Sequence, residues 1–579
     1  MLRITQTNIS HKKRIRTRYT VVFAWIILLL NSKTALTQTT YVPINHWAYN
    51  YLERLETKQL IQGVLNGTKP LSRNEVAGYL AMVHQRVAQG NELTRVEQDQ
   101  LSFLNIEFKE ELNELLEHLI PYKTRINRIR NHKSIRKIFP RILYKNDRNF
   151  LNWGEDRFKI YFDPILYFQK NYNDTDTLNH TEKVFQRSSG FRIRGNLGHR
   201  LGFFIDIRDT KESGTRKYRL GNYTLPGLGF VRATSPDHIY HDETVAYLRF
   251  GFKHIKFVFG KFSNNWGPGY TSSLILSDFV TSYDQFKLEI IFNKFKFTSL
   301  YAFLIDYQEH EDDILQPKKY FAAHRLEFAL LKWLTLGFTE TVMFKDRSFE
   351  PAYLNPIMFY RSAEHYLGSP DNMLMGLDFK CTVINHLKFY GELLIDDITT
   401  TKLGTGWYGN KIGYSAGIFV VDPLHIFNTD CRIEYARLRP YVYSHHNTLS
   451  YKHYNSLLGH PIGPNADELY VELNYHVSRY TKLGLFTEHC RHGANPPDKN
   501  VGGDADKPHS DGDDLYVKFL DGELETNQSV GISCSYELFR ECYVKAKYGF
   551  SNSENVLVKK NQRVNSKAHR VWISLGLNY

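Results

Sequence analysis

The last residues of the chain alternate strictly between apolar positions and smaller or polar ones. Val571, Ile573, Leu575, Leu577 and Tyr579 share one parity, and the sequence ends on an aromatic residue. A period of two that ends on Phe or Tyr is typical of the closing strand of an outer-membrane β-barrel, in which apolar side chains face lipid. The pattern therefore predicts a membrane-spanning strand at this position.

Runs with the same period recur from about residue 157 onward. In one of them, Phe203, Ile205 and Ile207 alternate with Asp206 and Arg208. Counting such runs predicts an all-β membrane barrel of about eighteen antiparallel strands, an even number that suits a bacterial barrel. Short turns fall near residues 198, 253, 294, 331, 385, 427, 478 and 539, and long segments fall near 209–241, 263–283, 347–370, 443–466 and 491–522. We expect the short turns on the periplasmic side and the long loops outside the cell.

Charged residues of both signs occupy the parity that would face the lumen of this barrel. They are Arg192, Arg194, Asp206, Arg208, Glu392, Arg432, Glu434 and Glu472. A dry core would not tolerate these charges, because their desolvation is costly. The pattern predicts a wet, ion-paired lumen.

Residues 38–150 follow a helical pattern instead of an alternating one. Residues 47–60 carry apolar side chains on one face, as an amphipathic helix does. Ser72 with Glu75, and Thr94 with Glu97, have the spacing of a capping box, so each pair predicts the start of a further helix. These elements predict a small periplasmic helical domain. The basic residues of 122–148 are interpreted as a solvated linker helix, with contact to inner-leaflet lipid headgroups as the alternative.

The first residues predict export. A basic stretch at 11–18 precedes an apolar run at 20–30, and small residues follow at 35–37. The apolar run is too short to cross a bilayer as a helix, which favours a signal peptide over a signal anchor. The predicted organisation is a signal peptide at 1–37, the helical domain with its linker at 38–150, and the barrel at 151–579.

Composition narrows the possible partners. Residues 1–37 hold seven Lys or Arg and no Asp or Glu, so their removal reduces the formal charge from +13 to +6. A mildly basic chain is compatible with an acidic glycan and gives no support to nucleic-acid binding. Mean hydropathy is −0.43, which excludes a helical membrane protein. It does not exclude a β-barrel, because the apolar and polar residues of alternating strands cancel in the mean. Aromatic residues make up 14% of the chain, as two interfacial girdles would require.

Several stretches of the predicted barrel resemble the Wzi family of capsule-assembly outer-membrane proteins. They are residues 260–269, 273–277, 353–357, 371–374, 391–397, 439–443 and 458–467. The Trp-Gly-Pro-Gly turn at 266–269 and the stretch at 458–467 are the most specific. The resemblance implies an eighteen-stranded barrel, a helical bundle at its periplasmic mouth, and a surface lectin that holds capsular polysaccharide on the cell. Residues 46–48, 60–63 and 71–77 also resemble a single S-layer-homology repeat, which is either a structural helix pair or a second glycan site.

The candidate binding residues lie in the predicted extracellular loops. Trp266 and Tyr270 stand beside Asn264 and Asn265, a combination that suits a sugar ring and its hydroxyls. The equal alternative is a rigid turn that folds into the lumen. The full set predicted to bind polysaccharide is Asn264, Asn265, Trp266, Tyr270, Arg361, Asp396, Asp397, Trp407, Tyr443, His445, His446, Tyr451, His453 and Tyr454.

Other motifs have competing interpretations. The His and Tyr residues of 441–460 could hold a metal, but they lack an HExxH spacing, so local bonding or ligand contact is favoured. The acidic segment 498–514 misses the EF-hand pattern, which favours a solvated loop over a calcium site. Gly404–Gly409 matches GxGxxG but leads into a strand, so it has no helix N-terminus to hold a phosphate. Asp396 and Asp397 are expected to bind sugar hydroxyls or to pair with Arg361.

These observations predict an outer-membrane lectin that attaches capsular or exopolysaccharide to the cell surface. The alternative is a channel or polysaccharide export conduit gated by the helical domain, and a third class is a glycan-modifying enzyme that uses Asp396 and Asp397. We predict a monomeric, non-enzymatic barrel in contact with outer-membrane lipid, without a cofactor, a metal or nucleic acid as partner.

Overall fold

The computed structural model describes residues 40–116, 148–155, 158–177, 181–307, 316–347, 349–368, 371–446, 449–559 and 562–579. The predicted signal peptide and nearly all of the basic segment 122–148 lie outside the described residues. Within the described ranges, no helix is long and apolar enough to cross a membrane.

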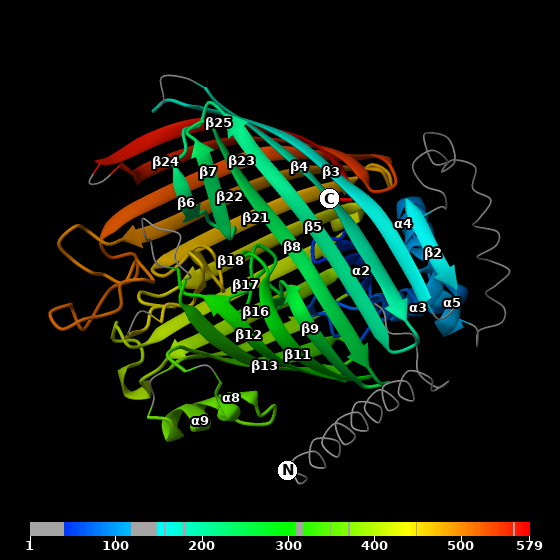
Figure 1. Ribbon diagram of the computed structural model, residues 1–579, viewed down its shortest axis with the longest axis horizontal. Helices are drawn as coiled ribbons and strands as arrows, with labels where there is room; N and C mark the ends of the chain where they lie inside the picture. Colours follow the sequence, from blue (N-terminus) through cyan, green and yellow to red (C-terminus); the bar gives the residue numbers. More distant parts are fainter. Residues whose placement is uncertain are drawn as a thin grey trace, which may run out of the picture.

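Eighteen antiparallel strands close into a barrel, as the alternating pattern predicted (Figure 1). The first nine are β3 (Phe158–Thr175), β4 (Glu182–Leu197), β5 (Leu201–Gly214), β8 (His238–Gly251), β9 (Ile255–Phe262), β11 (Tyr283–Phe292), β12 (Phe295–Ile305), β13 (Lys318–Leu331) and β14 (Leu334–Phe344). The others are β15 (Asn372–Cys381), β16 (Leu387–Asp397), β17 (Lys411–Val421), β18 (Thr429–Leu438), β21 (Ala466–His476), β22 (Thr481–Ala494), β23 (Glu523–Phe539), β24 (Cys542–Lys559) and β25 (Gln562–Leu577).

The C-terminal strand closes the barrel. β25 pairs antiparallel with β3, from Leu577 opposite Leu166 to Ala568 opposite Thr175. On β25, Ile573 is 47% exposed while its neighbour Ser574 is 3% exposed. Because successive side chains of a strand point to opposite faces, this contrast separates the outer wall from the lumen. The prediction of a closing strand with an apolar outer face is confirmed.

Short strands and helices that are not part of the eighteen-stranded wall lie in the N-terminal segment and in the connections between strands. β2 (Leu151–Glu155) extends the edge of β3, and β6 (Gly221–Thr224) with β7 (Phe230–Ser235) form a hairpin between β5 and β8. The N-terminal segment contains β1 (Thr68–Lys69). The loops contain β10 (Asn265–Trp266), β19 (Lys452–His453), β20 (Ser456–Leu457), α8 (Pro351–Leu354), α9 (Tyr360–Tyr366), η3 (Thr400–Lys402) and η4 (Pro423–His425).

The N-terminal helices form a second core. They are α2 (Ala48–Thr57), α3 (Arg73–Ala88), α4 (Arg95–Glu107) and α5 (Lys109–Leu116). Both predicted capping boxes are confirmed, because Ser72 caps α3 with Glu75 and Thr94 caps α4 with Glu97. The apolar faces of these helices meet around fully buried residues such as Leu80. The helices therefore have a hydrophobic core of their own beside the barrel.

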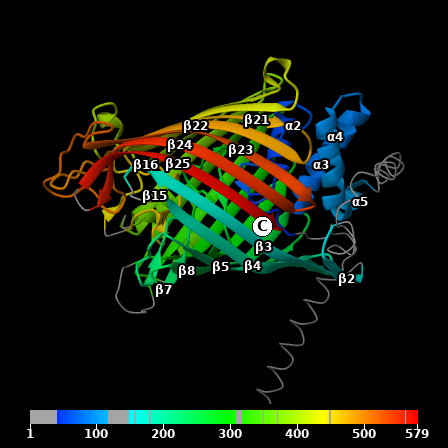
Figure 2. The ribbon, with the colours of Figure 1, turned by 90° about the horizontal axis from the view of Figure 1, so that it is seen from above.

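This helical domain covers the end of the barrel that carries the short turns. The amide of Gly63 donates to the carbonyl of Lys332 (3.0 Å), and the amide of His386 donates to Thr57 (2.9 Å). The long loops project from the opposite end (Figures 1 and 2). The predicted alternation of short and long connections is thus confirmed. The helical domain lies at the same end of the barrel as the short turns.

Buried ion pairs fix the helical domain to the wall. Arg54, which is 3% exposed, pairs with Glu97 of α4 (2.9 Å) and with the wall residues Asp422 and Asp430. Glu53 accepts from Lys388 (2.7 Å) and from Arg432 (2.8 Å). Buried charges are tolerated only when each one is paired, so these contacts hold α2 in one position.

We predict that Arg54→Ala loosens the helical domain from the barrel. The substitution removes one partner from each of three buried carboxylates, which keep Lys58 or His476 as partners, so we expect a cost of up to about 3–5 kcal/mol. Hydrogen exchange of the α3 amides should report this loss in purified protein. The exposed Arg95 supplies the control; equal exchange in Arg54→Ala and Arg95→Ala would show that the ion pairs do not hold the domain.

Candidate functional site

The loop between β9 and β11 folds into the lumen. Trp266 is 1% exposed, and its amide donates to the carbonyl of Leu276 (2.7 Å). The side-chain amide of Asn264 donates to Gln285 (2.8 Å), and that of Asn265 donates to Asp278 (2.8 Å). Of the two interpretations of this motif, the structure shows the turn inside the lumen. These three side chains therefore do not lie on the outer surface.

Inward-facing glutamates of the wall hold this loop in place. Glu392 accepts from the amides of Gly269 (2.8 Å) and Leu274 (2.7 Å). Glu434 accepts from the amides of Tyr270 and Thr271 (both 2.8 Å).

Tyr270 is bound a second time, because its hydroxyl donates to Glu472 (2.6 Å). At Gly267 a Cβ atom would lie 2.2 Å from Glu392 Oε1, so only glycine allows this approach. The Trp-Gly-Pro-Gly sequence thus packs its backbone directly against the wall.

The prediction of an ion-paired lumen is confirmed in part. Asp206 pairs with Arg192 (2.8 Å) and Arg208 (2.7 Å) across the inner face of β4 and β5. The expectation that the charges are solvated is wrong for Glu392 and Glu434, which are 8% and 2% exposed. Backbone amides of the loop take the place of water around these two carboxylates.

The helical domain and the loop meet inside the barrel. β1 of the N-terminal segment pairs antiparallel with β10 of the loop, Thr68 opposite Trp266 and Lys69 opposite Asn265. The amide of Gly267 also donates to the carbonyl of Gly67 (2.8 Å). Polypeptide from the short-turn end and polypeptide from the long-loop end therefore form one continuous plug.

The loop between β18 and β21 covers the plug from the long-loop side. Tyr443 and Tyr451 are fully buried and their rings stack, with centroids 5.6 Å apart. Asp396 accepts from the amide of Tyr443 (2.7 Å), so its partner is this loop and not Arg361. Leu458 accepts from the amide of Ser277 (2.7 Å). This loop is thus bonded both to the wall and to the plug.

Two histidines of the covering loop are held in their neutral form. Nδ1 of His453 accepts from the amide of Ile305 (3.1 Å), and Nδ1 of His460 accepts from the amide of Ile462 (3.3 Å). Burial lowers the pKa of each imidazole to about 3. A proton on either Nδ1 would face a backbone N–H, so protonation and the observed bonds exclude each other.

Partly exposed aromatic residues gather elsewhere, in the loop between β16 and β17 and the loop between β22 and β23. Trp407 bridges to Tyr516, with ring centroids 5.8 Å apart, and Tyr408 stacks on His509 at 3.5 Å. Lys402 Nζ lies 3.2 Å from the centre of the Trp407 ring. Tyr516 is 56% exposed. We call these five residues the Trp407 cluster.

Sequence reasoning named Trp407 but missed the other members of this cluster. Tyr516 and His509 lie more than 100 residues along the chain from Trp407, in a loop noted only for its acidic residues. The sequence shows that both residues are aromatic, but it does not show that the fold brings their loop next to the loop of Trp407.

The remaining predicted residues are spread over the long-loop end. His446 and Asp397 are exposed, and His445 and Arg361 are partly buried. His453 and the partly exposed Tyr454 adjoin each other, and the Tyr454 ring meets Phe230 at 5.3 Å. These side chains do not form one site with Trp407.

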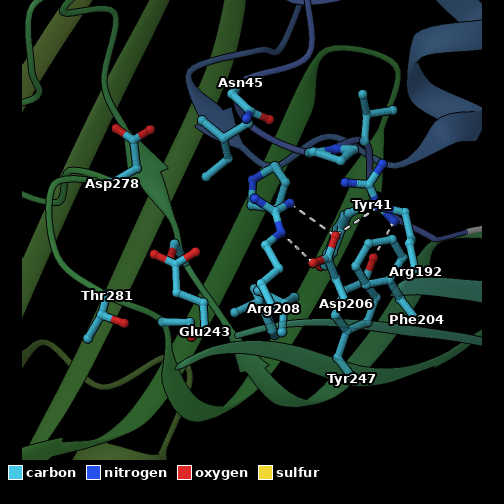
Figure 3. A pocket seen from close by; sticks show the side chains of 18 of the residues that line it. Tyr41, Asn45, Arg192, Phe204, Asp206, Arg208, Glu243, Tyr247, Asp278 and Thr281 are labelled. Carbon is cyan, nitrogen blue, oxygen red and sulfur yellow. Dashed lines mark hydrogen bonds and ion pairs between the residues drawn. The ribbon is translucent and has the colours of Figure 1, made fainter. Parts of the chain in front are cut away.

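A cavity of about 320 Å³ remains inside the barrel beside the plug (Figure 3). Its walls are the N-terminal segment at Tyr41–Asn45, the inner faces of β4, β5 and β8, and loop residues 278–282. Arg192 and Arg208 converge on Asp206 there, so this carboxylate already has its partners. The volume is at the lower end of the range for small-molecule sites, large enough for one or two sugar rings.

Metal ligands do not converge in the part of the chain that the structure describes: it contains no group of three or more His, Cys, Asp or Glu residues able to hold an ion. In the acidic segment, Asp506 pairs with Lys452, and Asp513 accepts from Ser510 (2.9 Å) and Asn500 (3.1 Å). These two acidic side chains are thus bonded within the protein.

A closed eighteen-stranded antiparallel barrel with an apolar outer face defines an outer-membrane β-barrel protein. The model of the family "Capsule assembly protein Wzi" matches residues 166–568, and the chain belongs to this family.

A solved structure of the same family agrees with the fold. The Escherichia coli Wzi structure, titled as an outer-membrane carbohydrate-binding β-barrel involved in group 1 capsule assembly, superposes with a TM-score of 0.52 at 14% identity, covering 94% of this chain and 100% of that one. Pseudomonas aeruginosa OccD3 (OpdP) reaches a TM-score of 0.39 at 11% identity, over 72% of this chain and 91% of that one. No curated protein matches the chain.

We predict that the covering loop opens as the pH falls. The unfolded loop takes up protons on His453 and His460 near pH 6.5 but the folded loop only near pH 3, so stability is complete above about pH 6.5 and is lost below it. Each histidine should raise the equilibrium constant for loop opening by up to about tenfold for each unit by which the pH falls. Hydrogen exchange at Tyr451 and Leu458, corrected for the intrinsic effect of pH, measures this slope.

Asparagine keeps a hydrogen-bond acceptor without a titratable group, so the double variant His453→Asn, His460→Asn should have a flat profile. His446→Asn, at an exposed position of the same loop, is the control and should keep the slope. A slope that persists in the double variant would show that other groups control the loop.

Proposed function

We propose that this protein is an outer-membrane lectin that attaches capsular or exopolysaccharide to the cell surface. The observation that carries the proposal is the plug, in which the N-terminal segment and a loop from the long-loop end pair through β1 and β10. A lumen occupied in this way favours a function carried by the outer loops over transport through the barrel. Family membership and the carbohydrate binding stated for the Escherichia coli protein support the same function.

The Trp407 cluster is the part of the outer surface that best suits a sugar. An aromatic ring packs on the apolar face of a pyranose, and polar groups at its edge bond the hydroxyls. Tyr516 offers such a ring, with Trp407 beside it. Each contact is weak, but a polymer repeats its units, so many barrels along one chain retain it firmly. The proposal needs no catalytic residue.

We predict that Trp407→Ala with Tyr516→Ala releases glycan from the cell. Two aromatic contacts at about 0.7 kcal/mol each correspond to about tenfold weaker binding. The gene would be deleted and restored with each variant, and glycan would be measured on washed cells and in the medium. Total glycan should stay constant and shift into the medium. The control is Trp153→Ala, because Trp153 is 71% exposed on β2 at the short-turn end.

Glycan that accumulates inside the envelope would instead assign the protein to export. An unchanged glycan distribution after deletion of the gene would contradict any role in the capsule. If the deletion releases glycan but the double variant does not, the binding surface lies away from Trp407.

The conduit remains the second candidate, since a cavity lies inside the barrel beside the plug. We predict that the purified protein in planar bilayers is nearly silent. The double variant Glu392→Ala, Glu434→Ala removes the acceptors for four amides of the plug loop and should produce frequent openings. Steady large conductance of the unaltered protein would favour the conduit over the lectin.

A further inference from the structure

The loop between β14 and β15 covers the outside of the barrel. Its helices α8 and α9 lie against the outer wall below β13 in Figure 1. Tyr353 and Tyr360, which are 1% and 0% exposed, pack on Val342 and Phe344 of β14 and on Tyr301 of β12. These three wall residues share the outward parity of their strands, yet all are buried. The hairpin α8–α9 thus covers a patch of wall that would otherwise face the membrane.

A polar pair lies under this hairpin. His324 of β13 and Glu340 of β14 stand opposite each other in the register, with Nδ1 and Oε1 3.4 Å apart. The hydroxyl of Tyr360 forms a hydrogen bond with His324 Nε2 (2.7 Å). The backbone amide of Tyr360 donates to Glu340 Oε2 (3.1 Å). Tyr360 of α9 therefore satisfies both members of the pair at once.

The pair lies at the height of the apolar band. His324 has the same parity as Leu326 and Phe328, which are 37% and 39% exposed on the outer wall. Seven residues separate it from the turn at Leu331, a height of roughly 18 Å for a tilted strand, within a hydrocarbon band of about 25 Å. An ionisable pair at this height is costly when it faces lipid, so a cover is needed.

The other face of the hairpin is mainly apolar, with Asn355, Ser362 and His365 as its exposed polar residues. Ile357 is 90% exposed and Tyr366 is 91% exposed. Phe349, Phe359 and Leu367 are 61%, 46% and 39% exposed in the same loop. Five large apolar side chains exposed in one short loop mark a surface that contacts a membrane or a partner.

We propose that the hairpin α8–α9 is embedded in the outer leaflet and that its exposed face contacts lipid acyl chains. The apolar face continues the outer wall of β13 and β14, where Leu326 and Leu336 are exposed beside it. An amphipathic hairpin with its polar contacts toward the barrel and its apolar side chains outward matches the interfacial zone. The barrel is thereby anchored by a loop as well as by its strands.

Fluorescence quenching by brominated lipid tests this proposal. All five cysteines are free, so a cysteine-free variant can carry a single Tyr366→Cys or Ile357→Cys labelled with an environment-sensitive dye. The labelled protein is reconstituted in phosphatidylcholine vesicles with or without bromine on the acyl chains. Quenching at 357 and 366 should lie within about twofold of that at Phe328→Cys on the outer wall.

Leu403→Cys is the control for an exposed outer loop, since Leu403 is 50% exposed beside η3. A heat-dependent mobility shift in gels verifies that every variant folds. Quenching at 357 and 366 as weak as at 403 would overturn the proposal.

An impermeant maleimide on whole cells provides a second measurement. Ile357→Cys should react much more slowly than Leu403→Cys. Rapid reaction at 357 places the hairpin in water, and protection without quenching places a second protein copy or glycan on it; both results contradict lipid contact. The quenching measurement on purified protein does not depend on glycan binding, so its outcome is independent of the lectin proposal.

Discussion

The need to pair every buried charge governs this structure. A β-strand places every second residue in the lumen, and here many of those residues are ionised. Glu392 and Glu434 are buried on the wall, and they are satisfied by backbone amides of a loop that enters from the long-loop end. Asp422 and Asp430 are satisfied by Arg54, which enters from the other end. Wall, loop and helical domain therefore depend on one another.

The same constraint acts on the outside of the barrel. His324 and Glu340 occupy outward positions where the neighbouring strand residues are apolar, and Tyr360 bonds both. On the inner wall the cover is a loop that closes the lumen, and on the outer wall it is a helical hairpin. In both places a polar wall residue determines where a loop must lie, and the loop then determines which surfaces stay available for partners.

This arrangement links the fold to the proposed function. Loop residues that enter the lumen are used for structure, which leaves the Trp407 cluster and its surroundings for an extracellular polymer. A plug fixed by buried bonds also gives the outer loops a rigid base. Rigid loops lose little conformational entropy on binding, which favours retention of a polymer through many weak contacts.

Local patterns in the sequence determined the strands, the closing of the barrel by β25 and the starts of α3 and α4, because a period of two and a capping box involve residues only a few positions apart. The site depended on contacts between distant residues. Trp266 looks like a sugar-binding residue until its loop is seen bonded to Glu392, more than 100 residues away, and Tyr516 joins the candidate site only because the fold places it beside Trp407. Only the tertiary structure decided which aromatic residues are buried and which face outward, since burial depends on what the closed barrel brings together.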